Sequence, residues 1–355
     1  MQDNGVVILD GDPYERGFGQ KNQRLTKSVE AAIAARLDKL ELNAYARDFL
    51  KQQWDIAQLM FEDQVAEING IADAYNMAPE RIFSYLNATI IEEAYPTAIV
   101  QDGCSVWAIS QTSKGPIVCK NRDYRGEHKN VQAAFIHRHP DIPGGEYFTI
   151  GSYGSPGGFS SGINAAGVAI ADTQIPTTDH GVGIIRYLLI NKLLCEANST
   201  MEAINLINSL PQAGGGSLTI CDPSGDVAIV EIGHIATQIE RSNHGYNFRT
   251  NHFLSSQLKS SYFNNKNDKI RNTSTGRLSR MAADLDDFDI LNPITESQKL
   301  LSSHDNDTHS GLCSHGNEGS TLSGAIYLCA KREVIYSNSN PCQDRWNHIK
   351  LNTFD

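Results

Sequence analysis

The sequence has no long apolar run and no recognisable leader. No stretch approaches the roughly 18 consecutive apolar residues that a membrane helix needs. Residues 1–11 are polar and lack the basic, apolar and small-residue zones of a secretory signal. We therefore expect a cytoplasmic protein with no membrane partner, unless a leader has already been removed.

The sequence also has fewer basic than acidic residues. The chain carries 30 lysines and arginines against 41 aspartates and glutamates, which gives a formal net charge of −11. An acidic surface repels phosphate backbones, so nucleic acid is excluded as an expected partner. The seven cysteines are odd in number and scattered, which does not fit a disulfide framework and favours a reducing compartment.

No pair of cysteines has the CxxC spacing of a structural zinc site. One polar stretch does contain several residue types that bind metals, namely His304, Asp305, Asp307, His309, Cys313 and His315. Their spacing matches no known ligand pattern, and polar loops often have this composition. We therefore expect neither a metal nor a cofactor.

What the sequence contains is a globular composition with an ordered change of pattern. Of the 355 residues, 40% are hydrophobic and 20% are charged, enough to bury a large core. Residues 12–95 read as helices: Asp12-Pro13 is a helix-start signal, and Val65, Ile68, Ile71 and Tyr75 repeat at spacings of three and four. There is no repeat of fixed period.

From residue 103 onward the pattern is dominated by strands. Residues 105–111 and 116–120 flank a turn and predict a hairpin. Further strands are predicted at 131–138, 146–152, 167–173, 218–221, 227–232, 236–241, 325–330 and 334–337. Helices are predicted at 183–194, 201–210 and 275–285, and loops at 257–274 and 302–319. The order of helices, strands, helices and strands predicts an α+β fold with two sheets and helices outside.

Cys104 stands where the strands begin, and we expect it at the first position of an edge strand. Gly103 before it tolerates the strained backbone that an N→S acyl shift requires. Cleavage after Gly103 would free the thiol and create an α-amino group whose reference pKa, about 7.7–8, suits a general base. The competing interpretation is a small core residue, the commonest role of a free cysteine.

Two further segments carry chemistry compatible with this site. If the hairpin pairs as predicted, residues 120–123 return beside Cys104. Asp123 could then orient the freed amine or the substrate amine, and Lys120 could favour the thiolate, although an ordinary solvated charge cluster is the alternative. Asn251, in Thr250-Asn251-His252, could donate an N–H to an oxyanion, although Asn is more often a turn residue.

Taken together and in their order along the chain, these short motifs resemble those of the isopenicillin N acyltransferase (acyl-coenzyme A:6-aminopenicillanic acid acyltransferase) family. That family is related to the penicillin V acylases and bile salt hydrolases. The resemblance runs almost the whole length, through residues 11–17, 67–72, 86–89, 103–105, 162–169, 250–253, 310–315 and 340–342. It implies an αββα four-layer sandwich of the N-terminal nucleophile hydrolases. It also implies self-cleavage into a helical small chain, 1–103, and a catalytic large chain, 104–355, which form one globular unit.

The resemblance also implies roles for particular residues. Cys104 would be the nucleophile and its freed amine the base, Asp123 would hold that amine, and Asn251 would bind the oxyanion. A backbone N–H near Gln174 would be the second oxyanion donor. Lys120 stands where the bile salt hydrolases carry arginine, and a lysine lacks the planar fork. The bile salt hydrolases also carry an arginine in a later helix. In this sequence Arg277 or Arg280 could match it, and we favour Arg277.

We expect the substrate to be a small N-acyl amide or an acyl thioester such as acyl-coenzyme A, and the chemistry to be hydrolysis or acyl transfer. Hydrolysis is favoured because water is always present. Two alternatives stay open: a papain-like pair of Cys104 and His252 that needs no cleavage, and a scaffold that binds a small acylated ligand without catalysis. The sequence is compatible with a homodimer.

Overall fold

The computed structural model describes residues 5–38, 40, 42–94, 103–124, 126–157, 160–242, 245–263, 269–306, 310–316, 319–343 and 345–352. One sheet contains, in spatial order, β1 (Val6–Asp10), β4 (Gln132–Arg138), β5 (Glu146–Ser152), β6 (Ser161–Asn164), β7 (Ala169–Thr173), β8 (Gly216–Cys221), β9 (Val227–Ile232) and β10 (Thr237–Ser242). The other contains β11 (Tyr246–Arg249), β2 (Cys104–Ile109), β3 (Ile117–Tyr124), β12 (Ser320–Leu328), β13 (Glu333–Ser337) and β14 (Asn347–Lys350).

The two sheets pack face to face, with β2 and β3 against β7 and β8. Side chains alternate between the faces of a strand, and β2 buries both of its faces. Val106 and Ala108 enter the core between the sheets, whereas Trp107 and Ile109 enter a second core beneath the outer helices. This explains why the strand is apolar on both faces.

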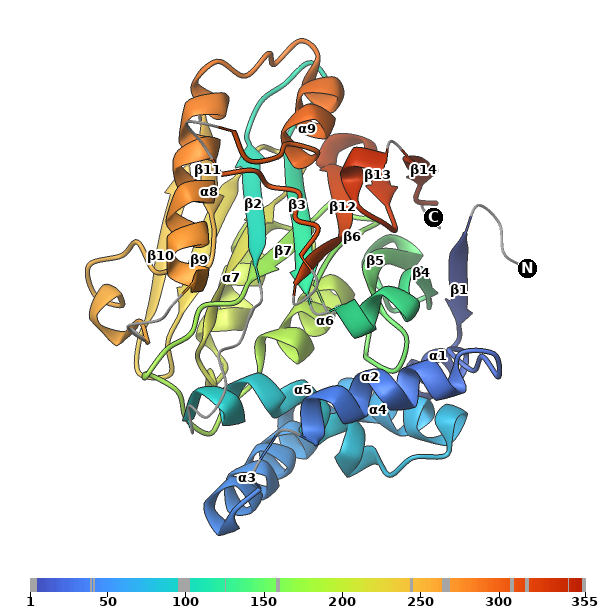
Figure 1. Cartoon of the computed structure of the whole chain (residues 1–355). Helices are drawn as coiled ribbons and strands as arrows, with labels where there is room; N and C mark the ends of the chain where they lie inside the picture. Colours follow the sequence, from blue (N-terminus) through green and yellow to red (C-terminus); the bar gives the residue numbers. More distant parts are fainter. Residues whose placement is uncertain are drawn as a thin grey trace.

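Helices cover both outer faces of the sandwich (Figure 1). The first sheet is covered by α6 (Arg186–Glu196) and α7 (Thr200–Asn208). The second is covered by α8 (Lys269–Asp286) and α9 (Pro293–Leu301). The expected αββα arrangement is therefore confirmed.

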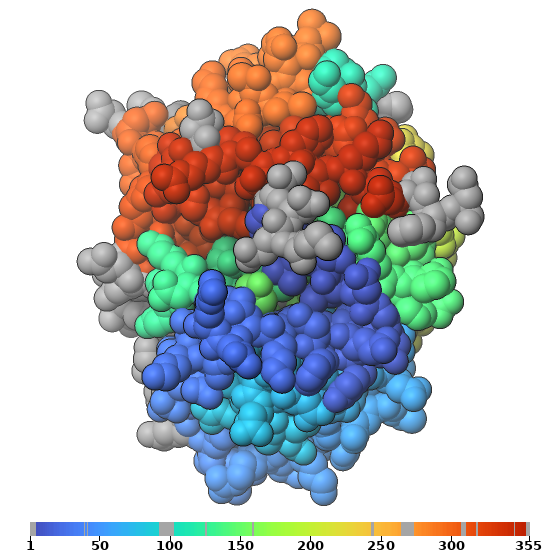
Figure 2. Space-filling view, turned by 90° about the vertical axis from the view of Figure 1, so that its right-hand side faces the viewer, coloured from blue at the N-terminus to red at the C-terminus, as the bar shows by residue number. Residues whose placement is uncertain are grey.

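The N-terminal helices lie across one end of the sandwich and make up the lower part of the face shown in Figure 2. They are α1 (Pro13–Phe18), α2 (Thr26–Leu37), α3 (Ala44–Met60), α4 (Glu62–Tyr75) and α5 (Pro79–Ala94). Asp12 caps α1 in a capping box with Glu15, as Asp12-Pro13 predicted. The four apolar residues predicted to share a face of α4 are all buried, and they belong to the core that also contains side chains of α6 and α7.

Several elements were not predicted. These are β1, β6, β11, α9 and β14; moreover, α8 begins at Lys269, inside a segment predicted to be a loop. Because β11 pairs with β2, the expectation of an edge strand at Cys104 was wrong. The missed strands are only four or five residues long and are formed by pairing with partners elsewhere in the chain, β1 with β4 for example, so a local pattern hardly marks them. In the described part of the chain, no helix combines the length and apolarity that crossing a bilayer requires.

Candidate active site

The β2–β3 hairpin brings residues 120–123 back to Cys104, as predicted. Cys104 lies opposite Arg122, and Val106 lies opposite Lys120. The strand is longer than expected, however: β3 continues through Asp123 to Tyr124, and all its residues are buried. The alternative of a solvated hairpin end is therefore wrong, and these charges lie inside the protein, where they need partners.

Cys104 is 7% exposed and its main-chain N–H donates to Asn251 Oδ1 at 2.9 Å. Burial raises the pKa of the Cys104 thiol, while the Lys120 ammonium acts to lower it. The carboxylates of Asp172 and Asp123 add to the increase. The thiol is therefore protonated in the resting site, so its use as a nucleophile requires a base that removes the proton.

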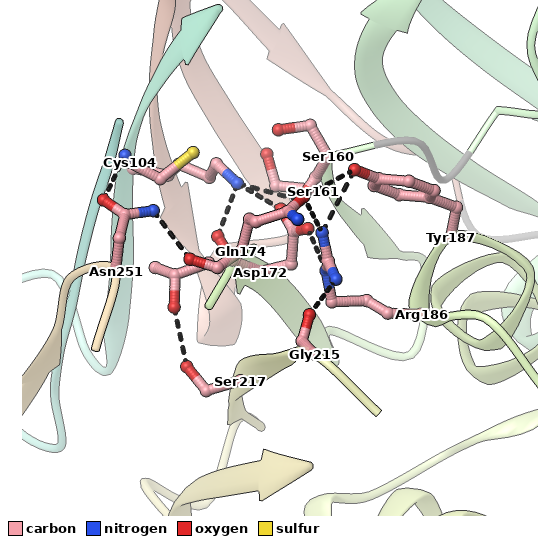
Figure 3. A network of polar contacts seen from close by, with 12 residues as sticks. Cys104, Ser160, Ser161, Asp172, Gln174, Arg186, Tyr187, Gly215, Ser217 and Asn251 are labelled. Atoms are coloured by element: carbon pink, nitrogen blue, oxygen red, sulfur yellow. Dashed lines mark hydrogen bonds and ion pairs between the residues drawn. The ribbon is translucent and has the colours of Figure 1, made fainter. Parts of the chain in front are cut away.

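Asn251, two residues beyond the end of β11, is fully buried and held on three sides. Its main-chain N–H donates to Ser274 Oγ at 2.8 Å, and its side-chain Nδ2 donates to the carbonyl of Gln174 at 2.8 Å. Figure 3 shows Asn251 between Cys104 and Gln174. Gln174 is thus brought to the site, with its carbonyl toward Asn251; its role as an oxyanion donor stays a prediction.

Arg277, on α8, links the candidate nucleophile to the asparagine. Its Nη2 donates to Asn251 Oδ1 at 2.7 Å, and its Nη1 donates to Ser105 Oγ at 3.0 Å and to the carbonyl of Cys104. Arg280, one turn further along the helix, pairs with Asp284 at 2.7 Å instead. Of the two arginines considered, the structure therefore brings Arg277 to Cys104.

Asp123 lies against Gly103. A Cβ atom built on Gly103 would come within 3.0 Å of Asp123 Oδ2 and 3.3 Å of Arg277 Nη2, so a side chain larger than hydrogen is tight there. Burial raises the pKa of Asp123 to about 6, against the opposing effects of Arg277 and of Thr321. Thr321 donates its hydroxyl to Asp123 Oδ1 at 2.6 Å. At neutral pH this buried carboxyl is ionised, ready to hold a cation.

Lys120 does not lie free beside the thiol. Its ammonium is buried in an ion pair with Asp172 and also donates to the carbonyls of Asp172, at 2.6 Å, and Ser160, at 3.2 Å. Arg186 Nε donates to the other oxygen of Asp172 at 2.8 Å. Its Nη2 donates to Gln174 Oε1 at 2.9 Å, which connects this network to the Asn251 side of the site (Figure 3).

Asp172, Arg186, Ser274 and Thr321 were not predicted. Asp172 alone carried a signal, since an acidic residue inside the apolar strand β7 must find a cationic partner when it is buried. Burial acts to raise its pKa, but Lys120 and Arg186 outweigh this and hold the pKa of Asp172 below its usual value.

His252 does not support the papain-like alternative. Its Nδ1 lies 2.7 Å from Ser274 Oγ and 3.3 Å from Thr250 Oγ1, so the ring is placed on the segment that supports Asn251. Cys104 instead contacts Asn251 through its main-chain N–H and Arg277 through its carbonyl oxygen.

With this geometry in view, the chain can be compared with known proteins. The family model described as acyl-coenzyme A:6-aminopenicillanic acid acyl-transferase matches residues 110–343, about two thirds of the chain. The chain therefore belongs to this family and is an enzyme of the amide-bond acyltransferase and hydrolase class. Asp123, Asn251 and Arg277 lie inside the matched stretch, whereas Gly103 and Cys104 precede it.

Among solved structures, the chain is similar to a mutant of conjugated bile acid hydrolase from Clostridium perfringens, at 13% identity and a TM-score of 0.45, over 70% of this chain and 97% of that one. It is also similar to penicillin V acylase from Agrobacterium tumefaciens, at 12% identity and a TM-score of 0.45, over 70% of this chain and 86% of that one. No curated protein gives a significant match.

Proposed function

We propose that this protein is a self-processing cysteine amidohydrolase that cuts its own chain after Gly103 and then cleaves an N-acyl amide through an acyl-enzyme on Cys104. The observation that carries the proposal is the setting of Cys104. It is the first residue of β2, directly after a glycine, with its main-chain nitrogen on Asn251 and with Asp123 and Arg277 beside the Gly103 backbone.

In the self-cleavage step, the Cys104 sulfur attacks the Gly103 carbonyl carbon. The C–N bond breaks as the C–S bond forms, and the proton given up by the thiol passes to the nitrogen of Cys104. Water then hydrolyses the thioester to a Gly103 carboxylate and the free thiol. The hydrogen bond from Cys104 N–H to Asn251 supports this step, because it holds the departing nitrogen in place. Glycine at 103 fits the narrow space between Asp123 and Arg277.

After cleavage the freed amine of Cys104 would act as the base that the buried thiol requires. The amine takes the thiol proton, the thiolate attacks the substrate carbonyl, and the protonated amine returns the proton to the leaving nitrogen. Asp123 would hold the ammonium form by a charge-assisted hydrogen bond. Departure of Gly103 would also vacate the space beside Asp123 in which the substrate amine must lie.

The remaining residues would support the oxyanion. We assign Asn251 Nδ2 and a backbone N–H near Gln174 as its donors, which requires Asn251 to exchange its present hydrogen bond to the Gln174 carbonyl for the substrate oxygen. Lys120 would act through charge, from within its pair with Asp172. Water is the favoured acyl acceptor, and transfer from an acyl thioester such as acyl-coenzyme A to an amine is the second candidate. We place the enzyme in the cytoplasm.

The deciding experiment is the intact mass of freshly purified protein under denaturing conditions, with Cys104→Ala in parallel. Cleavage after Gly103 divides the 39.0 kDa chain into pieces of about 11 and about 28 kDa, in proportion to their 103 and 252 residues. Cys119→Ala is the matched control, because Cys119 is a buried cysteine on the neighbouring strand whose thiol contacts Ser297.

Two pieces from the parent and from Cys119→Ala, with one piece from Cys104→Ala, is the expected result. A single chain in all three would remove the amine base and with it the proposed mechanism. Processed protein would then be given an N-acyl amide with and without an added amine, and the ratio of free acid to new amide measures hydrolysis against transfer.

A further inference from the structure

Four side chains with metal-binding atoms converge away from Cys104. His304 follows α9, Cys313 and His315 precede β12, and Cys342 lies in the turn after β13. Their ligand atoms all lie within 4.8 Å of one another. No metal was expected here, because the spacing of the candidate ligands between His304 and His315 matches no known pattern, and Cys342 was not among them. The fold assembles a set that differs from the polar stretch considered in the sequence.

The distances within the cluster fit a tetrahedral metal site. His315 Nε2 lies 3.3 Å from Cys342 Sγ and 3.7 Å from Cys313 Sγ. Zinc binds sulfur at about 2.3 Å and imidazole nitrogen at about 2.0–2.1 Å, so a tetrahedron around it places sulfur and nitrogen roughly 3.6 Å apart. The two sulfur–nitrogen distances bracket this value, and the largest separation, up to 4.8 Å, requires only a small contraction.

The backbone around the cluster presents these side chains together. Cys313 and His315 are two residues apart, the spacing that puts side chains on one side of an extended segment. The N–H of Cys313 donates to Ser303 O at 2.8 Å, which places its segment beside the one that carries His304. Gly311 permits this approach, because a Cβ there would lie 2.4 Å from the carbonyl carbon of His304.

His304 has the supporting contact that metal-binding histidines usually show. Its Nδ1 lies 3.1 Å from the carbonyl oxygen of Cys313, so Nδ1–H donates and Nε2 is left with its lone pair. Histidine in this tautomer is ready to bind a cation without losing a proton. The same contact orients the ring, which lies 5.1 Å from the His315 ring between centroids.

We propose that His304, Cys313, His315 and Cys342 bind one zinc ion in a closed, structural site. Two thiolates and two imidazoles in a tetrahedral arrangement are the donor set typical of zinc, and binding releases the two thiol protons. Since the protein supplies all four ligands, no position is left for water, which makes the site structural rather than catalytic. It would join the connection between α9 and β12 to the turn after β13, at one end of these two strands.

The site would also stiffen the surroundings of Asp123. Ser314, between the two middle ligands, donates its N–H to Thr321 Oγ1 at 2.8 Å, and Thr321 donates that hydroxyl to Asp123. Asn340, two residues before Cys342, donates to the carbonyl of Thr321 at 2.8 Å. The zinc would therefore act on Asp123 indirectly, by fixing Ser314 and Asn340, which hold the Thr321 that donates to the carboxyl.

The first test measures metal content. The full chain, without a histidine tag and purified with a thiol reductant and no chelator, is analysed for zinc by mass spectrometry of the elements. One zinc per chain is expected, with loss of the zinc in Cys342→Ser and in His315→Ala. Cys195→Ser is the matched control, since this half-buried thiol lies on α6 and contacts Asn191; it should keep its zinc.

A second measurement on the unsubstituted chain covers the case in which the variants fail to fold. Protein stripped with a chelator is titrated with cobalt(II), and thiolate-to-cobalt charge transfer with the strong visible bands of a tetrahedral site should appear and vanish on adding zinc. Zinc should also raise the unfolding temperature in a concentration-dependent way. Absence of both signals, zinc retained fully in Cys342→Ser, or a Cys313–Cys342 disulfide in protein purified with the reductant would overturn the proposal, whichever way the self-cleavage experiment falls.

Discussion

Replacing Asp123 by asparagine should make the uncleaved protein more stable at neutral pH. Asp123 is 7% exposed, and burial raises its pKa to about 6 from the 3.8 of an ordinary aspartate, in spite of Arg277 and Thr321. The difference of about two pKa units corresponds to roughly 3 kcal/mol of folding free energy, at about 1.4 kcal/mol per unit. Asparagine has nearly the same shape and does not carry the charge that causes this cost.

The pH dependence follows from the same shift. Below pH 3.8 the carboxyl is protonated in both the folded and the unfolded chain, so it costs nothing. As the pH rises, the unfolded chain loses the proton first, and stability falls until the folded carboxyl also ionises near pH 6. The gain from Asp123→Asn should therefore be small at pH 4, about 0.5 kcal/mol, grow up to about pH 6 and change little above it.

The assay is thermal and denaturant unfolding of Cys104→Ala with and without Asp123→Asn, between pH 4 and pH 7. The Cys104→Ala background keeps the chain whole, and the titrations common to both proteins cancel in the difference. Asp172→Asn is the matched control with opposite sign, because it would strand Lys120 and Arg186 and should destabilise by roughly 3–5 kcal/mol. A gain that does not depend on pH, or a loss at pH 7, would refute the reasoning.

Two further changes test the geometry around the scissile bond. Gly103→Val should slow self-cleavage by about ten- to a hundredfold, because its Cβ would press on Asp123 and Arg277, a contact that costs roughly 1–3 kcal/mol. The rate is measured from the decay of the intact chain on a denaturing gel, and an unchanged rate would contradict the crowding. Arg277→Lys keeps the positive charge but loses the planar fork that contacts both Cys104 and Asn251, so self-cleavage should slow by about 10²-fold. The charge beside Asp123 is unchanged, so the pH dependence of stability assigned to Asp123 should still have its midpoint near pH 6. Equal cleavage rates, or a displaced pH dependence, would show that charge and fork are not separable in this way.

Local sequence signals predicted much of the framework of the site. The helix-start signal at Asp12-Pro13 and the three-and-four spacing along α4 act over a few residues, and both hold in the structure. The hairpin is the strongest case, since a short turn between two strands sets their register. That register pairs Cys104 with Arg122 and so brings the next residue, Asp123, close to Cys104, across a turn that was predicted from the sequence.

The contacts that complete the site are long-range. Asn251 is 147 residues from Cys104 in sequence and Arg277 is 173 away; family motifs pointed to both residues, but only the packing of β11 and α8 against β2 sets their contacts. The same packing removed the expected free edge from β2. Likewise, the pair of Lys120 with Asp172 exists because β3 of one sheet faces β7 of the other.

The sequence by itself therefore determined most of the helices and strands, the candidate nucleophile and the carboxyl one hairpin away, because these depend on neighbours along the chain. Tertiary structure alone decided what surrounds each charge. It gave Asp123 its raised pKa by burial and paired Lys120 with Asp172. It also brought His304, Cys313 and His315, from the connection between α9 and β12, together with Cys342, from the turn after β13. Burial of a charge and the convergence of distant side chains both depend on how sheets and helices pack. The spacing of residues along the chain does not directly encode which distant side chains come into contact.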